Sequence, residues 1–438
     1  MNSKEFELRE ADFSQYPKGL TYNMEVMKAW LYDGLPSTYL EYEAALAAIR
    51  EQSANRYFER LIETYLLNSN HCSVVVLQPS QTLAGEKDAA VRSRLASYKA
   101  SLAPAQLDEL VLSTQKLLAR QNTPDPSEEL EKLPKLTLQD INPIAPAGVP
   151  TVEYALDGIK VLHHEVAAGT IAYIKLYWDT SVLAAQQIPY LELLARVLGQ
   201  LETEAYSIEE LTSEIGISTG GASVFQNEVF GAGKSAEGSY QAKFSARIKV
   251  MRGNIGGSLK LLHELLYGSN LDNLSKLQEI VRREASGMEA MLTQKGNEIA
   301  ASRVLSYFSD RGMYEEQLGG VAYYRFIKEL ARTIDQQAEG LADTLKEICG
   351  LLFNTQNLTL SLTGTADSYA EFAAHVQELD LSSRAVDSQP LLSAQGQGVN
   401  EGFMSASQVQ YVVKGYDYKK SWASSIPASC RCSRRSSA

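Results

Sequence analysis

The sequence lacks a long apolar run, has few cysteines and carries no excess of positive charge. Without an uncharged apolar stretch of about 20 residues, it contains no candidate membrane span. Its first residues do not show the basic-then-apolar order of a secretory signal. Four cysteines, of which only Cys430 and Cys432 are close together, indicate neither disulfides nor a zinc site. A net charge of −12 argues against nucleic acid as a partner and suits capture of cationic peptides. We therefore expect a cytoplasmic protein that binds neither nucleic acid nor membrane.

The five histidines do not form a recognised metal-binding pattern. His163 and His164 are adjacent in a predicted strand, where neighbouring side chains point to opposite faces, so they cannot chelate one ion without distortion. His263-Glu264 begins like the H-E-x-x-H motif, but Tyr267 stands where the second histidine is needed. We predict an ordinary half-buried strand for the first pair and a helix-face histidine at the rim of the core for the second.

Signatures of other reaction classes are also missing. The G-A-G-K-S stretch at residues 231–235 is too short for the G-x-x-x-x-G-K-S/T phosphate loop, and it lacks the third glycine of G-x-G-x-x-G. We predict a loop between strands there. No G-x-S-x-G elbow of a serine hydrolase occurs.

The composition, with 45% apolar and 21% charged residues, is that of a globular protein, and 438 residues suffice for two to three domains at about 150 residues each. Apolar residues recur at helical spacing between residues 39 and 67, and the run H-C-S-V-V-V-L at 71–77 predicts a buried strand. Two charged helical runs, at about 86–101 and 104–120, predict a helical hairpin, and a proline-punctuated linker extends to about residue 150.

Strand and helix patterns alternate from residue 150 to residue 380. Strands are predicted at 159–166, 171–179, 222–231, 239–250 and 358–364, and long helices at 254–268, 272–308, 316–333 and 337–351. This order predicts a two-layer α+β sandwich, with one sheet of five or six strands covered by helices on one face. A further strand is predicted at 407–413.

Three stretches carry a resemblance to a known family. Residues 5–36 contain E-F-E-L-R-E-A-D-F, Y-P-K-G-L and W-L-Y-D-G-L-P; residues 315–324 are E-E-Q-L-G-G-V-A-Y-Y; and residues 400–415 are N-E-G-F-M-S-A-S-Q-V-Q-Y-V-V-K-G. Together they resemble the presequence-protease branch of the pitrilysin/insulinase-type zinc metallopeptidases. The combination is more specific than any single stretch.

The resemblance covers about residues 1–415 and implies an α+β fold of repeated two-layer sandwich domains of the clamshell type, joined by a helical hairpin. The halves of such enzymes close around an unfolded peptide. On this map the domains are the C-terminal part of a second α+β domain at 1–83, the hairpin and Pro-rich linker at 84–149, a complete non-catalytic third domain at 150–380, and the first strand of a truncated fourth domain at 396–420.

Enzymes of this family hold zinc with H-x-x-E-H on a helix, a motif that the sequence lacks. The counterpart of the metal-bearing helix is predicted at residues 188–194, with Glu192 as its only candidate ligand. The family also supplies an Arg and a Tyr from R-x-x-G-G-A-Y. The S-T-G-G-A-S stretch at 218–223 has neither, and we predict a Gly-Gly turn there. The resemblance therefore implies no catalytic, cofactor-binding or metal-binding residue in this chain.

The resemblance leaves two functional interpretations open. In the first, the chain is a fragment of a zinc metalloendopeptidase that degrades unfolded peptides. It would contribute chamber wall, hinge and substrate docking, with zinc in a missing N-terminal half. In the second, it is a non-catalytic partner subunit of a heteromeric metallopeptidase. The expected partners are a peptide substrate and the N-terminal catalytic half or a partner chain.

Residues 421–438 share no composition with the rest, being rich in Ser, Arg and Cys. Codons can be chosen so that a shifted frame encodes L-G-F-K-Y-T-G-K-L-Q-V-L-K-T-I-I-S, which has apolar residues at helical spacing. This peptide resembles the continuation of the family's fourth domain after its first strand. We predict a frameshifted tail without a fold of its own. If this is right, the shifted frame in the gene should run on and encode an Arg and a Tyr near a Gly-Gly. A stop shortly after residue 438 would contradict it.

Overall fold

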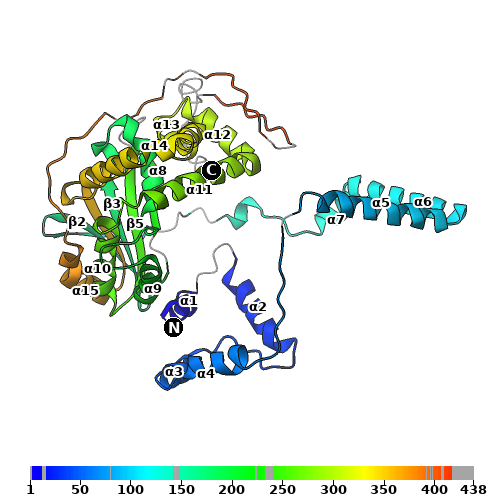
Figure 1. Cartoon of the computed structure of the whole chain (residues 1–438), viewed down its shortest axis with the longest axis horizontal. Helices are drawn as coiled ribbons and strands as arrows, with labels where there is room; N and C mark the ends of the chain where they lie inside the picture. Colours follow the sequence, from blue (N-terminus) through cyan, green and yellow to red (C-terminus); the bar gives the residue numbers. More distant parts are fainter. Residues whose placement is uncertain are drawn as a thin grey trace. The chain divides into compact units, whose positions relative to one another are not determined.

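The computed structural model of the chain describes residues 2–11, 16–78, 80–141, 144, 148–221, 224–231, 240–390, 392–394, 396, 398–405 and 409–416. The predicted tail at 421–438 lies outside these residues. Contacts divide the chain into two compact units, one of Met1–Tyr42 with Val149–Ala438 and the other of Glu43–Gly148 (Figure 1). The two units are described separately below.

The first unit contains one six-stranded mixed sheet, in the order β1-β2-β6-β3-β5-β4. The parallel pair is β2 with β6, and the other neighbours are antiparallel. The strands are β1 (Val152–Leu156), β2 (Ile159–Glu165), β3 (Ile171–Asp179), β4 (Val224–Gly231), β5 (Tyr240–Met251) and β6 (Leu358–Gly364). The predicted α+β class and the predicted single sheet are confirmed. Repetition of such sandwich domains stays a prediction.

Alternation along β3 decides which face of the sheet is covered. Ala172, Ile174, Leu176 and Trp178 are fully buried, whereas the residues between them are only half-buried. The partner strands continue the apolar face, since Leu176 stands opposite Ala246 on β5 and Leu360 on β6. Complete burial of a leucine or isoleucine side chain contributes about 1.5–3 kcal/mol, so this face fixes the sheet against its helices.

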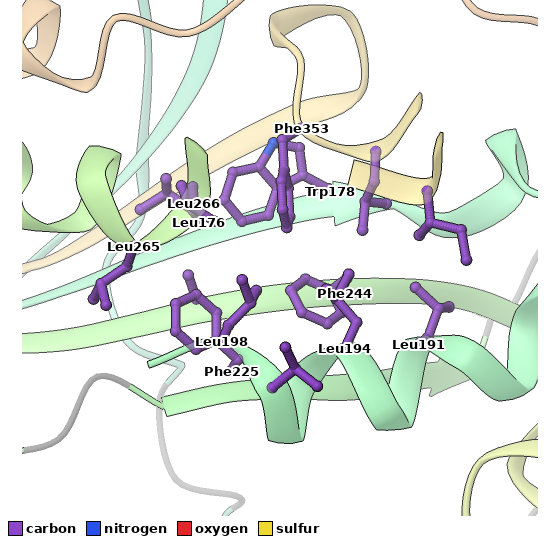
Figure 2. Close-up of a cluster of buried hydrophobic side chains, with 14 of the residues drawn as sticks. Leu176, Trp178, Leu191, Leu194, Leu198, Phe225, Phe244, Leu265, Leu266 and Phe353 are labelled. Carbon is purple, nitrogen blue, oxygen red and sulfur yellow. The ribbon is translucent and has the colours of Figure 1, made fainter. Parts of the chain in front are cut away.

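Helices of this unit follow or connect the strands. Among the described residues beyond 148 they are α8 (Ile188–Val197), α9 (Ile208–Ser218), α10 (Ile255–Tyr267), α11 (Leu274–Gln294), α12 (Gly296–Ser306), α13 (Asp310–Gly319), α14 (Val321–Leu352) and α15 (Ala366–His375). Figure 2 shows side chains from α8 and α10 meeting the apolar face of the sheet. Trp178 packs edge-on against Phe353, with the ring centres 4.9 Å apart.

The single helix predicted over residues 272–308 is wrong, because the chain is divided there into α11 and α12. Lys295 leaves the helical region, with φ −119° and ψ 34°. Gly296 follows, a residue type with poor helix propensity. The ring of Tyr411 occupies the space in which a Cβ at Gly296 would lie. The break is therefore filled from a distant part of the chain, which periodicity along one helix does not reveal.

The two helices predicted at 316–333 and 337–351 are also wrong as drawn. From Val321 to Leu352 the chain forms one 32-residue helix, α14. Buried Ile334 and Ala338 continue the helical spacing through the predicted gap. A continuous apolar stripe outweighs the polar residues between them.

Helix α1 (Asn2–Glu10) packs on the sheet-bearing unit, and α2 (Lys18–Trp30) follows it. The Phe6 ring is 2% exposed and fills the space in which a Cβ at Gly220 would lie. The Ser3 hydroxyl donates to the Gly216 carbonyl over 2.6 Å, and Lys249 pairs with Glu10 over 2.5 Å. These contacts give the E-F-E-L-R-E stretch a packing role that its sequence pattern did not indicate.

The second unit is built from α3 (Glu43–Ser53), α4 (Tyr57–Ile62), α5 (Leu83–Ser101), α6 (Pro104–Asn122) and α7 (Ser127–Glu131). The two long helices that composition predicted here are present as α5 and α6. The buried strand predicted at 71–77 is wrong. Residues 74–77 pair with no strand in the described part of the chain, and Val74, Val76 and Leu77 are 85%, 74% and 91% exposed.

The strand predicted at 407–413 is not formed either, as far as it is described: residues 409–413 have no ladder partner. Both stretches have the residue types of strands. A strand needs a neighbour to pair with its backbone, and β-propensity depends on this context. The alternation of residue types therefore cannot establish a strand by itself.

Glu316 organises the junction between α13 and α14. Its side chain is fully buried, accepts a hydrogen bond from the Ala322 amide over 3.0 Å and pairs with Arg303 over 3.0 Å. Burial raises the pKa of this carboxyl, and the positive charge of Arg303 opposes the change. A Cβ at Gly320 would overlap the Glu316 carboxylate, whereas one at Gly319 would meet no atom within 4 Å.

We expect Gly320→Ala to lower the free energy of unfolding by about 1–3 kcal/mol, the usual cost of overpacking a filled site. Gly319→Ala is the matched control. It adds the same methyl group at the end of α13, in open space, so its effect should be close to zero or slightly stabilising. Urea unfolding followed by circular dichroism measures both. Equal effects from the two substitutions would contradict the close contact.

Candidate functional site

Helix α8 is the predicted counterpart of a metal-bearing helix. It begins at Ile188 with Pro189 in its first turn, where a missing N–H costs nothing. Leu191 and Leu194 point from α8 into the core (Figure 2) and are fully buried. Burial of that face turns Glu192 away from the core interior, towards β4 and α11.

Glu192 is held by two neighbours. Arg196, one turn along α8, donates to its carboxylate over 2.7 Å, and the Asn227 side-chain amide from β4 donates over 3.1 Å. Its side chain is 17% exposed. Glu–Arg pairs four residues apart are a familiar feature of helices, so this contact could have been expected from the sequence.

A second carboxylate lies beside the same arginine. Glu284 on α11 is 3.7 Å from the Arg196 Nε and is also 17% exposed. Burial raises the pKa of Glu284, which the charge of Arg196 opposes. The pKa of the neighbouring, fully buried Tyr323 is also raised by burial and by the negative charge of Glu284. Sequence reasoning missed Glu284 and Tyr323, because they reach this point from other helices.

This cluster of Glu192, Arg196, Asn227, Glu284 and Tyr323 does not fit a zinc site. Zinc ligands are Cys, His or carboxylate groups whose lone pairs are directed at one ion. Here the guanidinium of Arg196 already lies between the two carboxylates and balances part of their charge. Across the residues that the structure describes, no group of three or more His, Cys, Asp and Glu side chains is placed to hold a metal ion.

The histidine pair lies on β2, as predicted, with its two rings on opposite faces. His163 is 2% exposed, more deeply buried than the half-buried strand position predicted, and stacks on Tyr369 at 4.9 Å between ring centres. His164 forms a hydrogen bond with Thr151 over 2.9 Å. The structure therefore does not bring the two imidazoles together.

The other candidate stretches take part in local structure. His263, on α10, forms a 2.7 Å hydrogen bond between its Nδ1 and the Leu379 carbonyl oxygen. Gly221 has φ +124°, a conformation open to glycine, in agreement with the predicted Gly-Gly turn. Residues 222–223 of that stretch and 232–235 of the G-A-G-K-S stretch lie outside the described residues.

The model of a peptidase-associated family, defined by a domain that accompanies presequence-protease-type peptidases, matches residues 77–330, which is more than half of the chain. The chain belongs to this peptidase-associated family. The resemblance found in the sequence, to the presequence-protease branch of the pitrilysin/insulinase-type enzymes, is confirmed. The matched span includes α5, α6 and five of the six strands.

Curated relatives of this family member are much longer than it is. Protein HypA of Clostridium perfringens is 34% identical over 96% of this chain and 43% of its own length. Presequence protease 1 of Arabidopsis thaliana, named as chloroplastic/mitochondrial, is 30% identical over 94% of this chain and 38% of its own. The presequence protease of Schizosaccharomyces pombe is 24% identical over 82% and 35%. The chain thus spans about two fifths of the relatives' length.

Hydropathy of the described helices gives one further finding about this family member. None of them combines the length and the apolar character that crossing a bilayer requires.

We expect the purified chain to retain no stoichiometric zinc after incubation with zinc chloride and desalting. The described histidines are bound to protein groups or separated by a strand, and Arg196 occupies the space between the two candidate carboxylates. Elemental analysis by mass spectrometry measures the metal content. One tightly bound zinc per chain, lost in His163→Ala or His164→Ala, would overturn this expectation.

Proposed function

We propose that the chain is part of a zinc metalloendopeptidase that degrades unfolded peptides, and that it contributes chamber wall, hinge and substrate docking. The observation that carries the proposal is its membership of the peptidase-associated family, with relatives named presequence proteases of which it spans about two fifths. The catalytic zinc would then be held outside this chain, in an N-terminal half. A cytoplasmic location remains part of the proposal.

The half-exposed face of the sheet is the surface that we propose for peptide docking. β3 presents Tyr173, Lys175 and Tyr177 on this face, opposite polar and charged residues of β5. Lys175 pairs with Glu228 over 2.6 Å and lies over the Tyr177 ring. Aromatic rings and long amphipathic side chains can cover an extended chain while their polar ends stay hydrated. Such a surface suits peptides of varied sequence.

Exposed apolar residues of the second unit support a missing partner half. On α5, Val91, Leu95 and Tyr98 lie at helical spacing and are 45%, 56% and 56% exposed. Residues 74–77 add four consecutive apolar side chains, each at least 74% exposed. Apolar surface of this extent is usually buried against another chain or domain, and unpaired strand-like backbone favours pairing with a strand.

The alternative proposal is a non-catalytic subunit of a heteromeric metallopeptidase, which closes over a separate chain carrying H-x-x-E-H. The same exposed surface would serve there. The neighbouring DNA distinguishes the two proposals. An upstream frame that ends within a second domain supports a divided enzyme, and a complete separate two-domain protein supports a heteromer.

We expect this chain to assemble with an N-terminal segment that carries H-x-x-E-H, encoded upstream or taken from the Clostridium perfringens relative. The mixture should cleave a fluorogenic unstructured peptide, and neither part should do so alone. A chelator should abolish the cleavage. Size-exclusion chromatography and fluorescence measure assembly and activity. Absence of both with both N-terminal segments would contradict the proposal.

Two variants show whether the exposed 74–77 run contributes to assembly. Leu77→Asp places a charge within the run and should weaken assembly. Leu136→Asp changes a leucine that is equally exposed, at 91%, in the linker, and should leave assembly unchanged. Equal assembly of the two variants would show that the run is not part of the contact.

A further inference from the structure

Residues 389–403 form a strap: a segment whose described residues lie in neither helix nor strand but are nevertheless fixed to the sheet-bearing unit (Figure 1). Its described backbone amides donate to groups far away in the sequence. Gln389 donates to the Ser181 carbonyl over 2.6 Å, Leu392 to the Tyr240 hydroxyl over 3.1 Å, Ala394 to the Asp310 carboxylate over 2.8 Å, and Gly396 to the Tyr307 carbonyl over 3.0 Å. The strap is thus held mainly by single hydrogen bonds.

The strongest contact of the strap is made by Glu401. Arg303 on α12 donates to both of its carboxylate oxygens, over 2.7 and 3.0 Å, and the Tyr307 hydroxyl donates to it as well. Arg303 is 19% and Glu401 26% exposed at the side chain. Exposed ion pairs contribute little, but a bidentate pair with this degree of cover is among the strong charge-assisted contacts.

The same guanidinium also serves the interior. Arg303 bonds to the fully buried carboxylate of Glu316 over 3.0 Å, and Glu316 in turn accepts from the first turn of α14 at Ala322. Arg303 therefore joins two carboxylates of different standing: Glu316 cannot leave, because it is in the core, whereas Glu401 lies on a segment with no core of its own.

The chain beyond the strap follows the helix that carries Arg303. Tyr411 lies against Gly296 at the start of α12, and Gly415 lies against Val304 near its end. Phe403 lies beside Arg325 of α14, with the guanidinium 5.7 Å from the ring centre. The position of residues 409–416 thus depends on the same surface as the strap.

We propose that Arg303 and Glu401 form a latch that closes the strap onto α12 and α13, and that opening this latch frees the segment leading to residues 409–416. The proposal does not rest on the proposed function. The latch gives the chain after residue 380 a held state and a released state, and only the held state contains the Glu401 contact. Glu316 keeps Arg303 in place in both.

The test is hydrogen exchange of the full chain at pH 7, read at peptides that contain Ala394 and Gly396. Glu401→Gln should speed exchange there by about ten- to a hundredfold, the effect expected from loss of hydrogen bonds to a charged group. Its melting temperature should stay close to that of the wild type, because Glu316 retains Arg303. Arg311→Gln is the control, since it removes an exposed pair with Glu315 on neighbouring α13. It should leave the strap unchanged.

Arg303 variants separate the latch from general stability. Arg303→Gln should open the strap and also lower the melting temperature, because it leaves Glu316 buried without its cation. Adding Glu316→Gln should recover much of the melting temperature while the strap stays open. Wild-type exchange at Ala394 and Gly396 in Glu401→Gln would overturn the proposal, as would equal effects of Glu401→Gln and Arg311→Gln.

The pH dependence of the latch follows from the groups that face Glu401, which are Arg303 and Tyr307 from α12 and its end, Glu316 from α13 and Arg325 from α14. Hydrogen bonds from Arg303 and Tyr307 lower the pKa of Glu401 from 4.5 to about 2. A lowered pKa means that the contact is fully present above about pH 4.5 and is lost as the pH falls towards 2. Strap exchange, corrected for intrinsic rates, should rise over this range in the wild type. It should rise less in Glu401→Gln, and equal slopes would contradict the latch.

Discussion

The separation of apolar and polar side chains on the two faces of β3 is the constraint on which the rest of the structure depends. One face, from Ala172 to Trp178, must be covered, and α8, α10, α11 and α14 supply that cover. The other face stays half-exposed and polar. Because α8 packs through Leu191 and Leu194, its Glu192 is directed to the rim, where Arg196 neutralises it. The fate of the candidate metal helix is therefore decided by core packing.

Much of this sheet could be predicted from sequence, because alternation is a local property. The predicted strands at 171–179 and 358–364 coincide with β3 and β6. The same reasoning failed at 71–77, where the residue types are right but no described strand lies alongside. Side-chain pattern specifies which face could be buried, and only the neighbour that buries it makes a strand. Where the neighbour is outside the chain, the pattern misleads.

The junctions between helices and the candidate site failed for a related reason. The break at Lys295 is filled by Tyr411, and the turn at Gly320 is fixed by Glu316, both through contacts that no periodicity contains. At the candidate site, Glu192 with Arg196 follows from spacing on one helix. Glu284 arrives from α11, and its approach depends on how two helices pack. The sequence could identify a missing ligand set, but it could not show what replaced it.

Two arginines solve the same electrostatic problem in different settings, and the difference decides which of them can control a movement. Arg196 joins α8 to α11, and each of these helices is anchored by its own apolar residues, so loss of the pair leaves both in place. Arg303 joins the core to a strap whose other described anchors are mostly single hydrogen bonds. A contact shifts an equilibrium only if it differs between the two states. Glu401 bonds to Arg303 in the held state alone, whereas Glu192 and Glu284 keep theirs in any state in which the helices are packed.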